Sequence, residues 1–371
     1  MKKTLPALLA AISPLLADPC CEMLQEPHCY PYAVNPPIST NPSWTWGGHL
    51  DFIYWRPSVE NNEFAEVISN SVTLRAPSPN GNYSLTLKDF NYDYDGGFRL
   101  GIAVGLPQNE WRLNADWAHY LHSNSGSVFT NDPETVALGS YFNFGTFSFI
   151  RSGVAFGQTS VNANWKMQLD LIDLVCNREF YVGHQVTLMP YGGLQVLLLK
   201  QKIHTNNTIA SFIGGEPLAT QTSLATTTAD FKGVGIEAGL FSSWQFMCSL
   251  SFYGDVSASA LYGKSKSNLT GNATTPTLTN APTTGFTAHV TQNHHGIKAL
   301  LDLSFGLQWR ESFCQQMAII TLRVGWEQQI YFRQNTIPSL SFDQALFNVN
   351  LSKPAGDISL QGLVVSANFT Y

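Results

Sequence analysis

Some residues in this chain of 371 could do chemistry if their surroundings were suitable. Gly233-Val234-Gly235-Ile236-Glu237-Ala238 fits the glycine spacing of a dinucleotide-binding loop. That loop needs a strand before it and a helix after it. Here the glycines alternate with Val234 and Ile236 and lead into a polar turn, which favours a β-strand. The motif therefore predicts no nucleotide cofactor.

Histidines are the next candidates, as zinc ligands or as a catalytic base. His294 and His295 are adjacent, but no cysteine or carboxylate lies at a zinc-like spacing from them. If the chain forms a membrane barrel, His119, His122 and His204 fall near its extracellular rim, where a barrel protease would place Asp and His. Nothing in the sequence pairs them with an acid. We expect no metal site, no cofactor and no enzymatic activity.

Charged residues on the polar face of alternating segments indicate the lining of a pore instead. The positive members are Arg99, Arg112, Lys166, Lys298, Arg310 and Arg323, and the negative members are Asp116, Asp170, Glu237, Asp255, Asp302 and Glu327. Equal numbers of each sign predict a transverse field and weak ion selectivity. The alternative is that these charged side chains form ion pairs with one another and fill the interior of the barrel. Glycines on the same face, such as Gly101 and Gly235, favour an open lumen.

The elements that carry these charges show a period of two. From Phe98 to Leu106, apolar residues alternate with Gly and Arg, and Leu301 to Arg310 behaves in the same way. Period two places the two sets on opposite faces of a strand. The sequence therefore predicts an all-β fold.

A soluble β-sandwich also alternates, but three features favour a membrane barrel. The strands run about nine to eleven residues, which suits a tilted membrane strand. Their apolar faces contain almost no polar residues, and the last strand closes on an aromatic residue, Tyr371. We expect an antiparallel transmembrane barrel of 10 or more strands (10–16), with short periplasmic turns and long extracellular loops.

Connections of two lengths alternate along the chain and set the topology. The short ones fall near Pro107–Glu110, Cys176–His184, Ser242–Gln245 and Glu311–Gln315. The long polar ones fall near Pro57–Tyr92, His122–Val161, His204–Asp230, Lys264–His294 and Arg333–Asp357. Tryptophans are expected at the membrane interfaces, with Trp46, Trp111, Trp244 and Trp309 at the inner ends and Trp55 and Trp165 at the outer ends. Trp55 has the wrong parity for a lipid-facing residue.

The N-terminus predicts export. Lys2 and Lys3, the apolar stretch up to Leu16 and the small residue Ala17 are typical of a signal peptide over residues 1–17. Residues 18–43 are rich in proline and cysteine, which predicts an extended periplasmic arm, and residues 44–371 form the barrel. Charged residues are only 12% of the chain and the net charge is −6, which argues against a nucleic-acid partner.

Six cysteines fall at or near the periplasmic side of this topology: Cys20, Cys21, Cys29, Cys176, Cys248 and Cys314. That compartment is oxidising, so disulfides are available. We expect the arm cysteines to cross-link to inner turns or to neighbouring envelope proteins. Cys176 and Cys248 could instead be buried as small apolar residues.

Several segments resemble the Legionella-type major outer membrane protein family, which also occurs in chlamydia-like bacteria. They include Tyr94 to Gly101, Trp165 to Val182, Phe231 to Gly235, Leu261 to Gly263, Gly325 to Gln329 and Gln361 to Leu363. The resemblance covers most of the chain outside the arm. It implies a pore-forming outer-membrane barrel and transfers no catalytic residue.

The sequence therefore predicts a porin for passive diffusion of small hydrophilic solutes, in contact with outer-membrane lipid and able to form homo-oligomers. The alternative is an adhesin or structural envelope protein that acts through its long loops and periplasmic cysteines. An outer-membrane enzyme is the third class.

Overall fold

The computed structural model describes residues 44–70, 83–107, 111–132, 135–144, 155–182, 185–213, 216–247, 249–275, 284–313, 318–343, 348–352 and 355–371. The predicted signal peptide and arm lie outside these residues, and so do Cys20, Cys21, Cys29, Cys248 and Cys314. Within the described ranges every regular element is a β-strand. They contain no helix long and apolar enough to cross a membrane.

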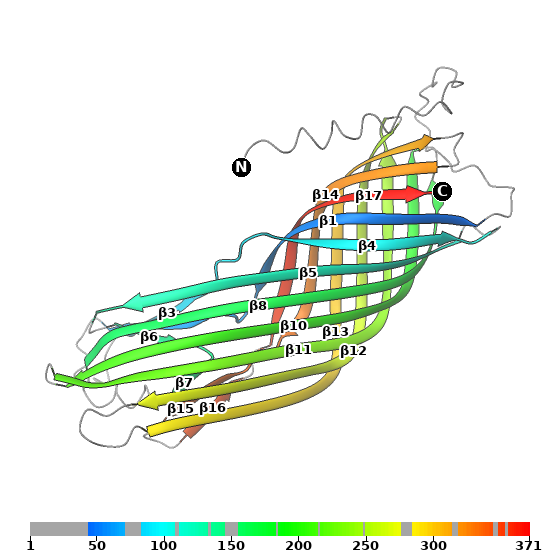
Figure 1. The fold of residues 1–371 in the computed structure, drawn as a ribbon. Coiled ribbons are helices and arrows are strands. Elements are labelled where there is room, and N and C mark those ends of the chain that lie inside the picture. Colours follow the sequence, from blue (N-terminus) through cyan, green and yellow to red (C-terminus); the bar gives the residue numbers. More distant parts are fainter. Residues whose placement is uncertain are drawn as a thin grey trace.

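Ten antiparallel strands form one closed barrel. They are β1 (Thr45–Val59), β4 (Asp95–Gly105), β5 (Trp111–Thr130), β8 (Ala155–Arg178), β10 (Val186–Ile213), β11 (Glu216–Gln245), β12 (Leu250–Thr275), β13 (Thr284–Phe313), β14 (Ala318–Asn335) and β17 (Gly356–Thr370). Each pairs with its neighbour along the chain, apart from the short elements between them, and β17 closes the ring on β1. Figure 1 shows β14, β17, β1 and β4 side by side although they come from both ends of the chain. The predicted antiparallel barrel is confirmed, with ten strands.

The alternation of side chains along each strand decides which of them face lipid. On β1, Leu50 and Phe52 are more than half exposed, whereas Ile53 and Trp55 on the opposite face are fully buried. On β17, Leu363, Val365 and Phe369 face outward in the same way. A face of exposed leucine, valine and phenylalanine would be unfavourable in water but suits the hydrocarbon of a bilayer. The outer wall at this level is therefore the lipid-facing band.

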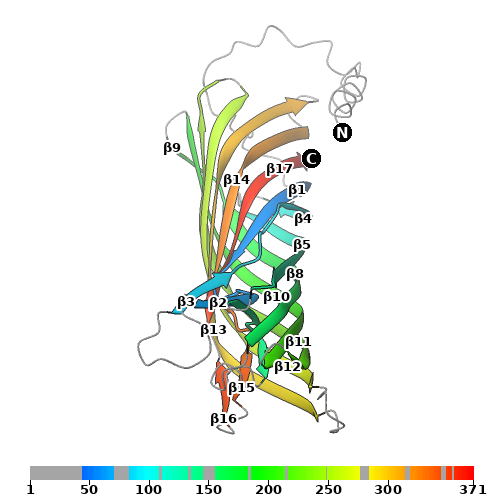
Figure 2. The ribbon, with the colours of Figure 1, turned by 90° about the vertical axis from the view of Figure 1, so that its left-hand side faces the viewer.

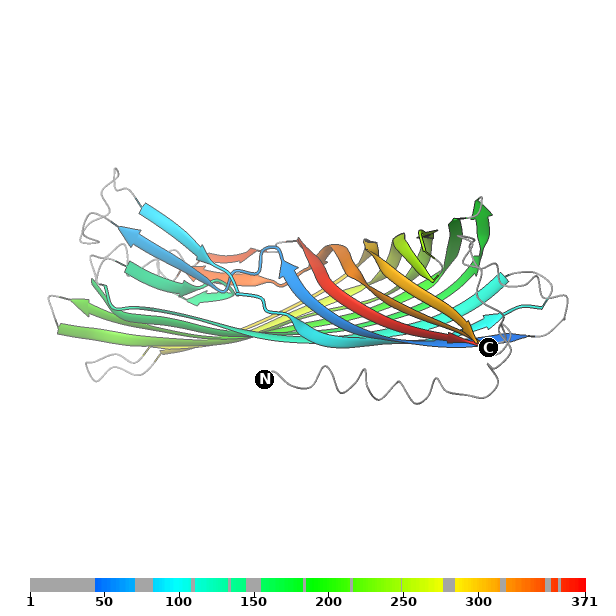
Figure 3. The ribbon, with the colours of Figure 1, turned by 90° about the horizontal axis from the view of Figure 1, so that it is seen from above.

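Several strands continue far beyond this band, and four of them are the longest. β10, β11, β12 and β13 have 28, 30, 26 and 30 residues, against the roughly nine to eleven that cross a membrane. The sequence predicted loops over 204–230 and 264–294, and this is wrong for most of both ranges because they extend the strands. Thr, Ser and Asn there keep the period of two, with side chains of Thr227, Ser265 and Ser267 buried inside. Figure 3 shows the resulting elongated molecule, with the C-terminus at one end.

Two small sheets pack against the inward face of the extended strands. One consists of β2 (Ala65–Asn70), β3 (Tyr83–Lys88) and β6 (Thr135–Gly139). The other consists of β7 (Phe142–Phe144), β15 (Ser339–Asp343) and β16 (Asn348–Ser352). Figure 2 shows β2, β3, β15 and β16 away from the C-terminus. The short β9 (Phe180–Val182) pairs with β10 at the other end, where the short turns lie.

The tryptophans divide into two groups. Trp46, Trp111 and Trp244 are exposed near the short-turn end, as an interfacial girdle requires. Trp55 and Trp165 were expected at the outer interface, but both are fully buried inside the barrel. Beyond the membrane the apolar residues of these strands face inward, because the outer surface of the barrel there faces water and its interior is filled with side chains.

Candidate functional site

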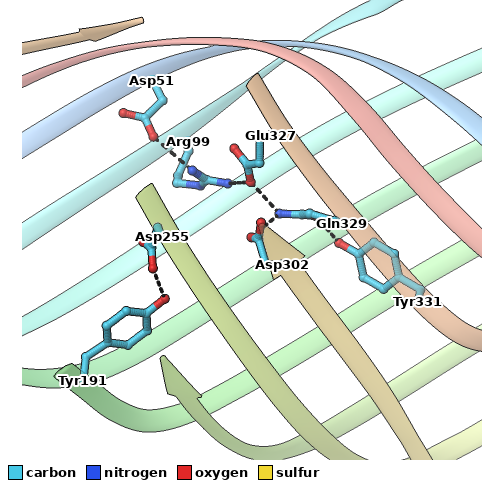
Figure 4. Close-up of polar contacts among 8 residues, drawn as sticks. All are labelled: Asp51, Arg99, Tyr191, Asp255, Asp302, Glu327, Gln329 and Tyr331. Atoms are coloured by element: carbon cyan, nitrogen blue, oxygen red, sulfur yellow. Dashed lines mark hydrogen bonds and ion pairs between the residues drawn. The ribbon is translucent and has the colours of Figure 1, made fainter. Parts of the chain in front are cut away.

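Arg99 is the centre of a polar network in the lumen at the level of the lipid-facing band. It lies on the inward face of β4, opposite Asp51 of β1 in register. Its Nη1 lies 3.2 Å from the Asp51 carboxylate, and its Nη2 lies 2.6 Å from Oε1 of Glu327 on β14. Figure 4 shows the guanidinium between the two acids. One arginine thus joins three strands by charge-assisted hydrogen bonds.

The network continues through Gln329 of β14. Its amide Nε2 donates to Glu327 over 2.7 Å and to Oδ2 of Asp302 over 2.9 Å, and Tyr331 Oη donates to its Oε1 over 2.5 Å. Tyr191 Oη of β10 donates to Asp255 of β12, the strand beside β13, over 3.0 Å (Figure 4). These bonds fix carboxylates from β12, β13 and β14 on the inner wall.

Arg323 is the second cation at this level, and it is held differently. Its Nε donates to Gln308 over 2.8 Å, and its guanidinium carbon lies 4.5 Å from the centroid of the Phe241 ring and 5.6 Å from that of Tyr253. Cations favour the negative face of an aromatic ring. The two aromatic rings and Gln308 thus hold Arg323 in place. Among the described residues no carboxylate lies within salt-bridge distance of it, although Asp255 and Asp51 act on it electrostatically.

Acidic groups outnumber basic ones in this part of the lumen. We call the following set the charged layer: Asp51, Arg99, Asp116, Asp173, Glu237, Asp255, Asp302, Arg323 and Glu327. Its members come from eight of the ten barrel strands and act on one another electrostatically, from Asp116 and Asp173 through Glu237 to Asp302 and Glu327. Seven carboxylates thus face two guanidiniums, with His49 Nε2 lying 3.3 Å from Asp116.

The structure places ten of the twelve predicted pore-lining residues on inward faces. Arg112 pairs with Glu179 over 3.5 Å near the short-turn end, where Arg310 also lies. Lys298 lies on the other side of the charged layer and donates to the carbonyl of Arg333. The remaining seven belong to the charged layer.

Lys166 and Asp170 differ from the prediction, because both lie on the outward face of β8. They share that face with Ile172 and Leu174, whereas Trp165 and Leu169 point inward and are buried. The sequence pattern misled here because β8 inverts its apolar face beyond the membrane. The inward carboxylate of this strand is Asp173, which sequence reasoning missed together with Asp51. Each has an apolar inward neighbour, Leu171 or Ile53, two residues away, and only the parity of the adjacent lipid-facing residues could have identified it.

The inward glycines do not leave an empty wall. A Cβ on Gly101 would lie 2.0 Å from Asp116 Oδ1 and 2.1 Å from the His49 ring, and one on Gly239 would lie 2.3 Å from the Tyr191 ring. The glycines therefore let polar and aromatic neighbours lie flat against the wall. This differs from the expectation that they widen the lumen.

A second layer, apolar and buried, fills the barrel beyond the charged layer. It is formed by buried residues of the wall and of the segments that precede β2 and follow β3. We call it the apolar layer; its larger members are Ile53, Trp55, Phe64, Phe90, Tyr120, Trp165, Met167, Leu169, Leu197, Leu199, Phe231, Leu261, Leu300, Tyr331, Ile358 and Leu360. Trp55, Tyr120 and Trp165 have 0% exposure, whereas the side chains of Arg99 and Asp116 in the charged layer keep 19% and 18%. Arg99 and Asp116 are therefore more accessible than the apolar layer, whereas the Asp51 and Glu327 side chains are only 6% and 4% exposed.

Aromatic contacts and a few hydrogen bonds hold the segments that precede β2 and follow β3 in place inside the barrel. Trp165 contacts Phe90 and Tyr92 at centroid distances of 6.3 and 5.3 Å. Asn62 accepts a hydrogen bond from Tyr141 Oη and donates one to Tyr92 Oη, both over 2.7 Å. Burial holds the pKa of Tyr141 well above its usual value, so the phenol stays a neutral donor.

The other residues singled out for chemistry do not assemble a catalytic or metal site. Gly233–Ala238 is part of strand β11. His119 lies 2.6 Å from Asp170, but both are on the outward face, where Trp117 also approaches the carboxylate. His122 is buried in the aromatic cluster with Asp95 at 2.7 Å, and His204 contacts Thr226 at 2.9 Å. Among the described residues, no three His, Cys, Asp or Glu side chains are grouped to hold a metal ion.

Comparison with known proteins identifies the relatives of this chain. A family model described as the Legionella pneumophila major outer membrane protein precursor matches residues 39–371. A search of curated proteins found no match.

Among solved structures, the outer membrane protease OmpT from Escherichia coli is similar with a TM-score of 0.38 and 9% identity, covering 90% of this chain and 99% of that one. A Pseudomonas aeruginosa FadL homologue is similar with a TM-score of 0.25 and 11% identity, covering 90% and 93%. The CymD monoaromatic hydrocarbon channel has a TM-score of 0.26 and 9% identity, covering 92% and 93%. At such values none of these activities is carried over to this chain.

Proposed function

The chain belongs to the Legionella major outer membrane protein family and is an outer-membrane β-barrel, and from this premise we propose that it is a pore for small hydrophilic solutes. The charged layer is the observation that carries the proposal. A barrel that served only as a rigid surface scaffold would not need seven carboxylates on its inner wall at membrane depth, because burying charge is costly.

We further propose that this pore favours cations. The sequence suggested balanced charges, but Lys166 and Asp170 face outward while Asp51 and Asp173 join the lumen. Among these residues the inward faces then carry seven carboxylates and five cations. Arg112, Arg310 and Lys298 lie at other levels of the lumen, so within the charged layer the seven carboxylates face only Arg99 and Arg323. Rings of Asp and Glu attract cations and repel anions in a narrow aqueous path.

The apolar layer is the constriction in this proposal. Hydrophobic constrictions oppose the passage of water and ions by drying. Solutes would cross it where the segment around Phe64 and Phe90 moves relative to Trp165. This predicts a small conductance with closures, instead of the steady current of a wide channel.

Planar bilayer recording of the full-length refolded protein tests the proposal. We expect discrete steps in potassium chloride, and a reversal potential in a salt gradient that lies on the cation side. An anion-side reversal potential would contradict the cation preference alone. A folded protein that inserts but gives no steps would contradict the pore itself.

A structural or adhesive role at the surface is the second candidate, favoured by the length of β10–β13 beyond the lipid-facing band. A silent, fully inserted barrel whose deletion weakens the envelope or abolishes surface attachment would support it.

A further inference from the structure

Six lysines gather on the outward face of four neighbouring strands. They are Lys166 on β8, Lys200 and Lys202 on β10, Lys232 on β11, and Lys264 and Lys266 on β12, and we call this set the basic belt. All six are exposed. They are six of only eleven lysines in a chain whose net charge is −6. So strong a concentration of one sign on one wall is not explained by solubility alone.

The strand register brings the lysines together. Lys202 lies opposite Lys166 on the paired strands β10 and β8, and Lys232 lies opposite Lys264 on β11 and β12. His295 of β13 extends the row beside Lys264. Like charges directly across a strand pair are destabilising. Lys200 and Lys266 lie opposite Asp230, so the cost falls on the Lys166–Lys202 and Lys232–Lys264 pairs, and it is offset if the belt binds an anion.

Within the belt the six lysines outnumber the one outward carboxylate, Asp230. Asp230 lies opposite both Lys200 and Lys266, yet no carboxylate of the described residues is within salt-bridge distance of any of the six. Burial, and then the charges of Lys202 and Lys166, lower the pKa of the neighbouring His204. The field at this surface is therefore positive.

The belt begins where the lipid-facing band ends. On β11, exposed Ile236 and Val234 lead directly to Lys232, and on β12, exposed Tyr262 leads directly to Lys264. On β10, Leu198 precedes Lys200 on the same face. The strands run on from there to the long-loop end, so the belt lies at the boundary between hydrocarbon and the outer headgroups.

We propose that the basic belt binds the phosphate groups of a phosphorylated glycolipid of the outer leaflet, of the lipopolysaccharide class. Acyl chains would lie against the apolar side chains below the belt, and the phosphates would accept hydrogen bonds from the ammonium groups. Clustered lysines at a membrane surface hold anionic headgroups in this way. On β1 and β17 the outward residues at the end of the band are Arg56, Ser58, Ser359 and Gln361, so the bound lipid would occupy one side of the barrel. This inference requires the membrane barrel but not a conducting pore.

Lipid retention by the full-length protein tests the proposal. Purified protein in a non-ionic detergent would be titrated with bisphosphorylated lipid A and with the same lipid after dephosphorylation, and bound lipid counted by native mass spectrometry. The variant Lys232→Gln/Lys264→Gln removes one cross-strand pair. Arg56→Gln/Lys88→Gln is the matched control, since it removes the same charge from other strands.

We expect wild type and control to retain the bisphosphorylated lipid, and the belt variant to bind it about tenfold or more weakly. Binding should weaken with added salt. Equal affinity of wild type and belt variant, or no preference for the phosphorylated lipid, would overturn the proposal. Inorganic pyrophosphate that binds as tightly as the lipid would mean that the belt takes a free phosphate instead.

A second double substitution controls for the case in which the first variant loses lipid binding because it misfolds. Lys166→Gln/Lys202→Gln removes the other facing lysines and should weaken lipid binding similarly. Single-channel conductance of both belt variants should equal that of the wild type, because their side chains point away from the lumen. Lost lipid binding with unchanged conductance separates this proposal from the proposed pore.

Discussion

At the scale of single residues, the lumen depends on a few side chains whose partners come from distant parts of the sequence. Arg99 joins Glu327, 228 positions away, because β4, β1, β17 and β14 are neighbours in the closed ring. The sequence could place both on a polar face, since alternation is local. It could not show that they pair, nor that Asp51 and Asp173 shift the balance toward acid.

Replacing Arg99 should therefore change both stability and selectivity. Arg99→Gln leaves Asp51 and Glu327 buried without their cation, which we expect to cost about 3–5 kcal/mol of stability. The reversal potential in a salt gradient should move further toward the cation side, because the remaining carboxylates are less balanced.

Two variants test whether this effect comes from the lumen. Arg56→Gln removes an exposed, outward arginine from β1 and should leave the reversal potential unchanged. Arg99→Gln/Glu327→Gln should recover part of the lost stability. If Arg99→Gln and wild type share one reversal potential, Arg99 does not line the path of the ions.

At the scale of single strands, the sequence pattern predicts which side chains face lipid and which face the lumen only where the strand crosses the membrane. Leu301 to Arg310 and Leu363 to Thr370 alternate as the sequence predicted, since one side meets hydrocarbon and the other meets the lumen. β8 shows the limit. Near its short-turn end Ile172 and Leu174 face out, but beyond the membrane Trp165, Met167 and Leu169 face in. The environment changes along one strand, and no local pattern marks where.

The two faces of β13 should respond differently to the same substitution. Leu303 is 45% exposed on the lipid side, and Leu303→Arg should cost about 2–4 kcal/mol there and impair insertion. Ser304→Arg, one residue on, faces the lumen opposite Glu327 and should insert normally. Urea unfolding in lipid vesicles measures both, and equal damage would contradict the assigned faces.

The apolar layer should control the current through the pore. Trp165→Ala removes a fully buried side chain from it, which we expect to cost about 3–5 kcal/mol and to raise single-channel conductance. Trp244→Ala is the control, because Trp244 is exposed on the outer wall and lies away from the lumen. A conductance that stays the same in Trp165→Ala would place the constriction elsewhere.

At the scale of the whole molecule, a closed antiparallel barrel of ten or more strands followed from the sequence, but the final number, ten, and the height of the barrel did not. The segments 204–230 and 264–294 are rich in Thr, Ser and Asn, which also suit loops, so composition could not separate a loop from a polar strand. Pairing decides it. Thr226 of β11 pairs with His204 on one side and Thr270 on the other, and such ladders extend the wall beyond the membrane.

The last prediction concerns how this barrel is fixed in the envelope. Cys20, Cys21 and Cys29 precede β1 in the sequence, and an oxidising periplasm would allow them to form disulfides. We expect them to cross-link the barrel to its neighbours or to its own inner turns, near Cys248 and Cys314. Cys176 is a free thiol half-buried on the outward face of β8, near the same end.

Gel electrophoresis of outer membranes prepared with a thiol-blocking reagent measures this. Covalent oligomers that disappear on reduction, and that are lost in a Cys20/Cys21/Cys29→Ser variant, are the expected result. Cys176→Ser should leave the oligomers intact, because its thiol lies on the membrane wall and not in the arm. A monomer with six alkylatable thiols would exclude any disulfide in the native envelope, and the barrel would then be held by non-covalent contacts alone.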